Sequence, residues 1–361
     1  MGFYMKTIFE QTDIGGLTIK NRIIRSATQE GSADQNGNLT PALLSIYENL
    51  AAGGVGAIIT AMIGVDEYSR VFPQMLKAYG DAFVPAFSEL VNRVHKHNCK
   101  IIVQLAHNGA KANPDNGERP LAPSDFSINR DNPARSMTKK DIQNLTHRFT
   151  EAAMKCKEAK ADGVQIHAAH GYLLSQFLSP VFNKREDEYG GDISNRARIV
   201  FEIYSAIRGA VGDEYPVFIK INSEDRVAGG LTLEESIWVC SKLEKWGING
   251  IEVSGGLAVS LDSAPAQRVM NAEDEGTFAK NALAIAGNVN VPIVSVGGYR
   301  TPEIIEALLN KGNIQAVSLC RPLISEPDLP NRWKTGDRKK ARCISCNKCF
   351  DTKDGFGCKV Y

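Results

Sequence analysis

Three side chains that can hold an oxygen atom and deliver a proton lie close together in this sequence. His167, His170 and Tyr172 fall within the segment IHAAHGYLLSQFLSP, which begins at Ile166. Two imidazoles can donate hydrogen bonds to a carbonyl oxygen, and a phenol can act as a general acid. The run GVQIH at the start of the segment is typical of a strand. We therefore predict a catalytic site at the end of that strand.

A lysine in an apolar setting is a second candidate. Lys220 lies inside the run VFIKIN, where a charged side chain is rare unless it is paired or functional. It either points outward at the strand end or faces an anionic ligand, and we favour the ligand. Gln104, in the run KIIVQLAH, is another polar side chain near a strand end. To form one site, both must meet the two histidines in space.

The strands that would position these residues recur along the whole chain. Eight short β-rich runs, most of them continuously apolar, are typical of strands covered on both faces. They span residues 22–28, 56–62, 100–107, 163–167, 217–222, 250–254, 292–296 and 316–319. Helix-like segments alternate with them, so we predict an α/β fold, a closed (β/α)8 TIM barrel. A doubly wound open sheet is the alternative, but the first run is not followed by a G-x-G-x-x-G turn.

Helix start signals support this alternation. They are Thr40-Pro41, Thr138 with Asp141, Thr232 with Glu235, and Thr301-Pro302. A threonine N-cap, a proline at the first helical position and an acidic residue three positions on are typical of helix starts. We expect the last of these helices to end at Gly312. Residues 1–20 precede the first strand, and we expect a short hairpin there that plugs the bottom of the barrel.

Barrels of this kind carry their active sites at the C-terminal ends of the strands, and phosphate commonly binds after the seventh and eighth strands. Gly297-Gly298 follows the seventh run and Cys320-Arg321 follows the eighth. Glycines let the backbone approach a phosphate, and arginine supplies a positive charge. We therefore predict a phosphate site between these two strand ends.

The overall composition excludes several classes of function. A formal net charge of +1 gives no electrostatic case for binding nucleic acid or an acidic membrane surface. No apolar run is long enough to span a membrane, and the N-terminus does not read as a secretory signal. Cys99, Cys156, Cys240 and Cys320 are scattered through apolar segments, which does not suggest a disulfide framework. We expect a cytoplasmic protein in a reducing environment.

Taken together, the motifs resemble the Old Yellow Enzyme family of FMN-dependent ene-reductases, the NADH:flavin oxidoreductases. The similarity runs from about residue 8 to about residue 330. The matching segments are IHAAHGYLLSQFLSP, NKREDEYGG, Asn195-Arg196, Asn21-Arg22-Ile23, Gln104-Leu105 with His107 and Gly109, and Gly297-Gly298. Such a set of motifs in this order is highly specific.

The resemblance implies a role for each candidate residue. FMN would contact Ala27, Thr28, Gln29, Ala61, Gln104, Lys220, Gly297, Gly298, Cys320 and Arg321. Lys220 would face the N1–C2=O edge of the flavin, and Gly298 and Arg321 would hold its phosphate. His167 and His170 would bind the carbonyl oxygen of a small unsaturated substrate, and Tyr172 would donate the proton. NAD(P)H would be the reductant, and we expect a homo-oligomer.

The sequence departs from the family pattern at four places. Gln29 stands where many members have Thr or Cys, and Lys220 stands where they usually have Arg. Ala110-Lys111 replaces an expected arginine, and Cys320 replaces a glycine. These differences put individual flavin contacts and the flavin potential in question but leave the core set of residues intact.

Residues 336–361 form a cysteine-rich tail after a barrel expected over residues 1–335. Its cysteines are Cys343, Cys346, Cys349 and Cys358. Four sulfur ligands suit a [4Fe–4S] cluster or Zn²⁺ equally well, and an unoccupied tail of free or paired thiols is the third possibility. Larger relatives of the dienoyl-CoA reductase and trimethylamine dehydrogenase types hold such a cluster, with longer gaps between their cysteines. Because the sequence ends at Tyr361, we expect an electron relay to need a partner protein.

The sequence therefore predicts an FMN-dependent enzyme that reduces the C=C bond of α,β-unsaturated carbonyl compounds. The alternative is an electron-transferring or demethylating flavoprotein that uses the cysteine tail and a partner protein. A flavin-free barrel lyase and a non-catalytic flavin carrier are further possibilities from other classes.

Overall fold

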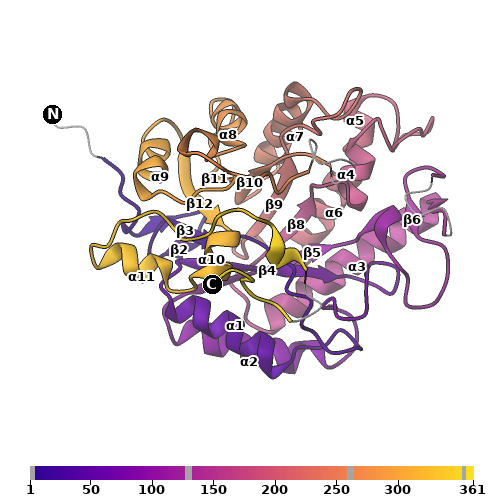
Figure 1. Cartoon of the computed structure of the whole chain (residues 1–361). Coiled ribbons are helices and arrows are strands. Elements are labelled where there is room, and N and C mark those ends of the chain that lie inside the picture. The colour runs from indigo at the N-terminus through magenta and orange to yellow at the C-terminus, as the bar shows by residue number, and fades with distance from the viewer. Residues whose placement is uncertain (1–4, 127–131, 258–263, 352–354) are drawn as a thin grey trace.

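Eight parallel strands close into a barrel in the computed structural model, which describes residues 5–126, 132–257, 264–351 and 355–361. The strands are β3 (Ile23–Arg25), β4 (Ala57–Gly64), β5 (Lys100–Ala106), β8 (Gly163–Ala168), β9 (Val217–Asn222), β10 (Gly250–Ser254), β11 (Ile293–Val296) and β12 (Ile314–Leu319). The barrel closes where β12 pairs with β3. Helices surround the strands (Figure 1). The predicted TIM barrel is confirmed, and each strand overlaps its predicted run.

The helices are α1 (Pro41–Ala52), α2 (Phe83–His95), α3 (Lys139–Glu158), α4 (Leu173–Leu178), α5 (Ile193–Arg196), α6 (Arg198–Val211), α7 (Leu233–Lys245), α8 (Ala279–Ala286), α9 (Pro302–Leu309), α10 (Arg321–Ser325) and α11 (Leu329–Lys334). Four of these helices, α1, α3, α7 and α9, begin where the sequence predicts a helix start. Thr40 caps α1, and capping boxes open α3 and α7. The predicted end of α9 at Gly312 is wrong. Asn310 ends the helix earlier, because its side-chain amide donates to the main-chain oxygens of Glu306, at 2.8 Å, and Lys6, at 2.9 Å.

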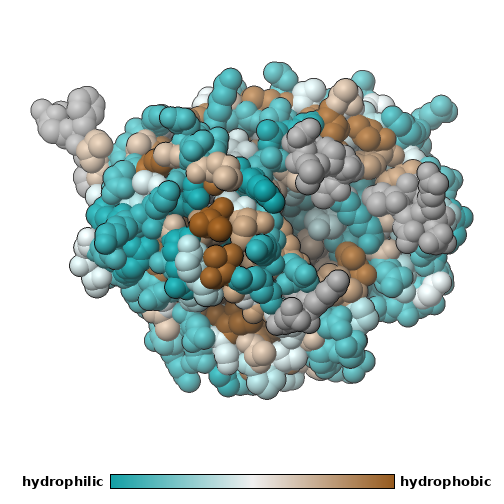
Figure 2. Space-filling model, viewed as in Figure 1, coloured by the Kyte–Doolittle hydropathy of each residue, from teal (hydrophilic) through white to brown (hydrophobic). Residues whose placement is uncertain are grey.

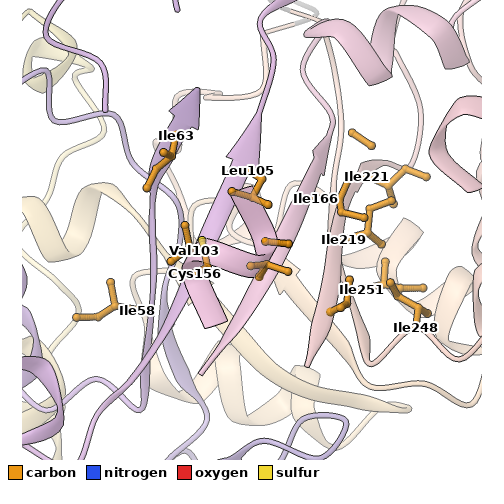
Figure 3. Packing of buried hydrophobic residues seen from close by; sticks show 14 of the residues in the cluster. Ile58, Ile63, Val103, Leu105, Cys156, Ile166, Ile219, Ile221, Ile248 and Ile251 are labelled. Carbon is orange, nitrogen blue, oxygen red and sulfur yellow. The ribbon is translucent and has the colours of Figure 1, made fainter. Parts of the chain in front are cut away.

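Apolar side chains pack on both surfaces of the barrel wall. Outside the barrel, isoleucine, leucine and valine side chains from β4, β5, β8, β9 and β10 pack in one buried cluster with residues of the surrounding helices, such as Cys156 of α3 (Figure 3). At the bottom of the interior, Ile14, Leu17 and Ile19 form a second cluster with Ile102 and other side chains from the strands. The three come from the hairpin of β1 (Thr12–Asp13) and β2 (Thr18–Ile19). The N-terminal hairpin therefore plugs the barrel as predicted.

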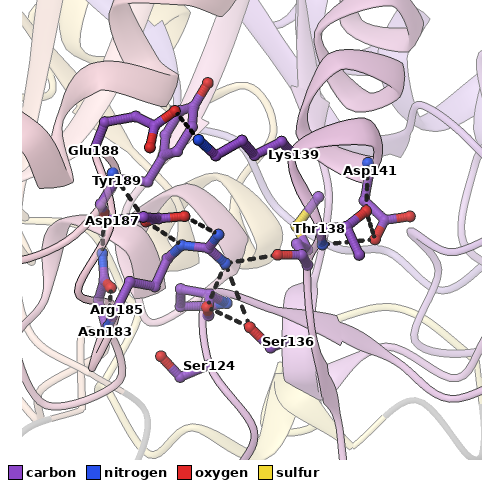
Figure 4. Close-up of polar contacts among 12 residues, drawn as sticks. Ser124, Ser136, Thr138, Lys139, Asp141, Asn183, Arg185, Asp187, Glu188 and Tyr189 are labelled. Atoms are coloured by element: carbon purple, nitrogen blue, oxygen red, sulfur yellow. Dashed lines mark hydrogen bonds and ion pairs between the residues drawn. The ribbon is translucent and has the colours of Figure 1, made fainter.

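The NKREDEYGG segment fixes the loop between α4 and α5. Arg185 forms an ion pair with Asp187, and its guanidinium donates to the main-chain oxygens of Pro123, at 2.9 Å, and Met137, at 2.6 Å (Figure 4). Those two residues flank the small sheet of β6 (Leu121–Ala122) and β7 (Arg135–Ser136), just before α3. This motif holds two long loops together and does not reach the candidate site.

The C-terminal segment packs back onto the barrel after α11. Arg300 accepts a hydrogen bond at its main-chain oxygen from the Ala341 N–H, at 2.8 Å, and donates from its guanidinium to the Cys343 oxygen, at 3.2 Å. Figure 1 shows this yellow segment crossing the face that carries α10. Figure 2 shows apolar surface near the C-terminal end, and Ile344 and Val360 are exposed there. Within the described ranges, no helix is long and apolar enough to cross a membrane.

Candidate active site

One cavity opens at the C-terminal ends of the barrel strands and gathers nearly all of the predicted site residues. It is lined by Ala27, Thr28, Gln29, Gln104, His167, His170, Tyr172, Lys220, Gly297, Gly298, Cys320 and Arg321. Among the predicted catalytic and flavin-binding residues, Ala61 is the exception: it does not line the cavity, and its N–H donates to the Tyr47 hydroxyl, at 2.9 Å. Met62 lines the cavity in its place, since β4 shifts register between Ile59 and Met62.

The two histidines and the tyrosine pack against one another in this cavity. The ring centres of His167 and His170 are 5.3 Å apart, and those of His167 and Tyr172 are 5.2 Å apart. His170 and Gly171 have φ values of 64° and 71°, so the chain turns sharply between β8 and α4. The N–H of His170 donates to Asn222 Oδ1 at 3.0 Å, which holds a left-handed conformation that is uncommon for a histidine. This turn brings three side chains from a short segment to one point.

Burial and neighbouring cations keep both imidazoles neutral. The pKa of His167 is lowered well below its ordinary value by burial first and then by Lys220 and Lys111. The pKa of His170 is lowered for the same reasons, with His167 contributing. The Nε2 of His170 lies 2.7 Å from Ser254 Oγ, whereas His167 Nδ1 is buried with no hydrogen-bond partner among the described residues. A neutral imidazole carries one N–H donor and one acceptor nitrogen, so each ring can donate one hydrogen bond.

Lys220 faces the cavity from β9 and forms an ion pair with Glu252, which lies on the side away from the cavity. Its Nζ lies 3.3 Å from Glu252 Oε1 on β10 and 3.1 Å from Ser26 Oγ. Both members of the pair are almost fully buried. Although burial acts to raise it, the pKa of Glu252 is lowered, because Lys220 and three hydrogen bonds stabilise the carboxylate. The reading of Lys220 as an outward-pointing surface lysine is therefore wrong.

Sequence reasoning missed Glu252 because the run GIEVS reads as an ordinary strand. The one available signal was a buried charge in an apolar strand that neighbours the strand of Lys220. Lys111 was noted only as a departure from the family pattern. Its Nζ lies 4.8 Å from the centre of the Tyr172 ring, and burial lowers its pKa to about 8.

Comparison with known proteins settles the family. The profile of the NADH:flavin oxidoreductase / NADH oxidase family matches residues 7–340. The chain belongs to this family, which includes Old Yellow Enzyme. It is 34% identical over 354 residues to an NADH oxidase of Thermoanaerobacter brockii, covering 95% of this chain and 53% of the relative. It is also 34% identical over 326 residues to an NADPH dehydrogenase of Halalkalibacterium halodurans, covering 90% of this chain and 92% of the relative.

Solved structures of known proteins agree with the fold. A 2-naphthoyl-CoA reductase superposes with a TM-score of 0.87 at 26% identity, covering 95% of this chain and 54% of that one. The Old Yellow Enzyme homologue of Zymomonas mobilis superposes with a TM-score of 0.78 at 25% identity, covering 93% and 94% of the two chains. The chain thus spans about half the length of the first curated relatives that it matches.

The cavity of this family member fits FMN by the chemistry of its lining. At one end, Gly298 has a φ of 75°, and a Cβ there would come within 2.4 Å of Val269, so the backbone beside Arg321 stays bare. Bare backbone and a guanidinium suit a phosphate. Also in the lining, Lys220 and Gln104 offer a cation and an amide, and the buried Oε1 of Gln29 has no hydrogen-bond partner among the described residues. Such groups suit the polar edge of an isoalloxazine ring.

His107, the third histidine of the matched motifs, lies outside this cavity. Its Nδ1 accepts the N–H of Gly109 at 3.0 Å, and its Nε2 lies 3.6 Å from Asp66 Oδ1. Burial lowers the pKa of His107 to about 3, so the ring is neutral. It supports the turn after β5 and does not face the other two histidines.

The four tail cysteines border one small second cavity. Cys343, Cys346, Cys349 and Cys358 line it together with Arg321 and Ile324. In the part of the chain that the structure describes, however, no three His, Cys, Asp or Glu side chains converge closely enough to hold a metal ion. Burial raises the pKa of Cys349 to about 11, so this thiol is protonated. The cysteines thus share one pocket without forming a finished metal site.

Proposed function

We propose that this protein binds FMN and uses NAD(P)H to reduce the C=C bond of small α,β-unsaturated carbonyl compounds. The observation that carries the proposal is the meeting of two neutral histidines with Tyr172 in the same cavity as Lys220 and Arg321. Family membership supports the flavin and the nicotinamide. The substrate class is inferred from the side chains, because two histidines that can hold a carbonyl oxygen lie beside a tyrosine that can donate a proton.

His167 and His170 bind and polarise the substrate in this proposal. Each neutral ring donates one hydrogen bond to the carbonyl oxygen, where negative charge builds up as the conjugated bond is reduced. Donors held in place by burial and by Ser254 stabilise that charge without having to reorganise. Because both pKa values are far below neutrality, this donation does not change across the physiological pH range.

Tyr172 supplies the proton that completes the reduction. Burial raises its pKa, so the phenol stays protonated and available as a general acid. The chemistry that FMN supplies when bound is two-electron transfer between a nicotinamide and an organic acceptor. Lys220 would hold the polar edge of the ring, and Arg321 with Gly298 would hold the phosphate.

Spectroscopy of the purified protein tests the proposal directly. We expect a yellow protein with stoichiometric FMN, whose flavin absorbance is bleached by NADH or NADPH and restored by an enone such as cyclohexenone. A protein that stays colourless after incubation with FMN would refute it. Bound flavin that reoxidises with oxygen but not with any enone would refute the substrate class alone. Light scattering on the same sample tests the predicted homo-oligomer.

A second candidate function is electron transfer through the cysteine tail. The observation that favours it is that Cys349 and Arg321 line both the cysteine pocket and the flavin cavity. A [4Fe–4S] cluster or Zn²⁺ held by Cys343, Cys346, Cys349 and Cys358 would require the thiols to move closer together. Iron, sulfide and zinc analysis of anaerobically purified protein discriminates between these cases. Four iron atoms per chain support the relay, whereas zinc or no metal excludes it.

A further inference from the structure

The carboxylate of Glu252 lies directly behind the cation that faces the flavin cavity. Glu252 and Lys220 are paired residues on the adjacent strands β10 and β9, and their charged atoms are 3.3 Å apart. Lys220 lines the cavity, whereas Glu252 does not. The carboxylate therefore acts on a bound flavin through Lys220.

Glu252 is held by donors from β8, from β12 and from the residue that follows β3. Its Oε1 accepts from Ser26 at 2.9 Å and from Ser318 at 2.5 Å, and its Oε2 accepts from Gln165 Nε2 at 3.0 Å. The side chain is fully enclosed in the barrel. Together with the Lys220 counter-ion, these donors keep the buried carboxylate ionised and fixed in position. Lys220 thus faces the cavity with a permanent partner of opposite charge.

The same carboxylate also sets the direction of a chain of amides. Because a carboxylate only accepts, Gln165 must turn its NH₂ group toward Glu252 and its oxygen away. That oxygen then accepts from Gln104 Nε2 at 2.6 Å, and Gln104 lines the cavity. Glu252 therefore fixes the side-chain orientations of both Lys220 and Gln104 at the cavity that would hold the flavin.

We propose that Glu252 is a positioning residue for the flavin: it fixes Lys220 and Gln104 and, by neutralising Lys220, lowers the reduction potential of bound FMN. A reduced flavin carries extra negative charge, which an unpaired lysine would stabilise strongly and a paired lysine stabilises less. This inference rests on FMN binding as proposed above.

The test is the reduction potential of FMN bound to Glu252→Gln, measured against a reference dye. Glutamine keeps the size of the side chain and removes the charge. We expect the two-electron equilibrium to shift toward reduced flavin at least tenfold, which is about 30 mV. Glu252→Asp, which keeps the charge, is the matched control and should stay within threefold of the wild type. A shift below threefold in Glu252→Gln, or a shift toward oxidised flavin, would overturn the proposal.

A double-mutant cycle shows whether Glu252 acts through Lys220. In Lys220→Gln the carboxyl group loses its counter-ion and takes up a proton, as buried unpaired acids do. Adding Glu252→Gln should then change the potential less than threefold, and a larger change would overturn the mechanism. If Glu252→Gln alone does not fold, the comparison of Lys220→Gln with the double variant still tests the mechanism, because neither protein carries an unpaired charge at these two positions. Wild-type protein that binds no FMN would refute the proposed function instead, so the two failures are distinguishable.

Discussion

The ammonium group of Lys111 lies 4.8 Å from the centre of the Tyr172 ring and donates to the main-chain oxygen of His170 at 2.9 Å. One cation thus contacts the proposed proton donor and the backbone of a proposed substrate-binding histidine. Lys111 forms no ion pair with a carboxylate among the described residues, and burial alone lowers its pKa to about 8. Its charge therefore acts on Tyr172 below about pH 8.

Replacing Lys111 by methionine should slow the step that needs the Tyr172 proton. A nearby cation stabilises the phenolate that forms when the proton leaves, and cation–π contacts are worth roughly 0.5–2 kcal/mol. We expect enone reduction to slow roughly twofold to thirtyfold below pH 8, the rate factors that correspond to this range of energies. In the wild type the rate should fall as the pH rises through about 8, where Lys111 loses its proton. The neighbouring His167 and His170 are already neutral there, so they add no step of their own.

A second lysine–tyrosine contact in the chain provides the control. Lys157 Nζ lies 6.0 Å from the centre of the Tyr215 ring and donates to the Val211 main-chain oxygen, and neither Lys157 nor Tyr215 lines the cavity. Lys157→Met should leave the pH profile of enone reduction unchanged. Stopped-flow measurement of flavin reoxidation by an enone from pH 6 to 9 gives both profiles. A Lys111→Met profile identical to that of the wild type would show that the contact has no role in proton transfer.

Tyr172→Phe separates the two halves of the proposed reaction. The substitution removes the proton donor and keeps the ring that packs against His167. Enone reduction should slow by about 10²–10⁴-fold, the usual contribution of a positioned general acid. Flavin reduction by NAD(P)H needs no proton from Tyr172. Its rate should therefore stay within about threefold of the wild-type rate. Equal losses in both steps, followed in separate stopped-flow experiments, would remove Tyr172 from the proposed role.

The sequence predicted the barrel and its lining well because both depend on local patterns. A strand that is apolar on both faces can be read from its own residues, and the residues just after it then lie at one end of the barrel. Gln104, His167 and Lys220 were placed correctly in this way. Ala61 was not, because the irregularity in β4 after Ile59 moves Met62 to the cavity, and no local residue pattern announces it.

Contacts between distant segments could not be predicted. Glu252 pairs with Lys220 only because β9 and β10 align in one register, and Lys111 reaches Tyr172 only through the folded loop after β5. Likewise, the cysteine motif gave no sign that Cys349 and Phe350 would border the flavin cavity. These positions depend on how whole elements pack, which a single sequence leaves open.

A buried carboxyl near the first strand should make stability depend on pH. Burial raises the pKa of Glu30 to about 7, although Arg25 lies 3.5 Å away and opposes the shift. The folded protein then keeps the Glu30 proton between about pH 4.5 and pH 7, whereas the unfolded chain loses it. The stability contribution of Glu30 is thus fully present below about pH 4.5 and is lost as the pH rises through about 7.

Glu30→Gln tests this linkage. Glutamine cannot ionise. The free energy of unfolding of the variant, relative to that of the wild type, should therefore rise by on the order of 2–3 kcal/mol between pH 5 and pH 8. Urea unfolding of both proteins at the two pH values measures the difference. Glu303→Gln, at an exposed position, should show no such change. Parallel pH curves for Glu30→Gln and the wild type would mean that Glu30 titrates normally.

The hairpin plug should matter for stability and not for chemistry. Ile19 is fully buried and packs with Ile102 and other interior side chains at the end of the barrel opposite the strand ends that form the site. Ile19→Ala removes most of that contact and leaves a cavity, so we expect a loss of about 2–5 kcal/mol in the free energy of unfolding. Thr18→Ala, on the exposed face of the same strand, should cost less than about 0.5 kcal/mol. FMN affinity and enone reduction at a temperature well below unfolding should match the wild type in both variants. A loss of FMN binding in folded Ile19→Ala would show that the plug also shapes the cavity at the other end of the barrel.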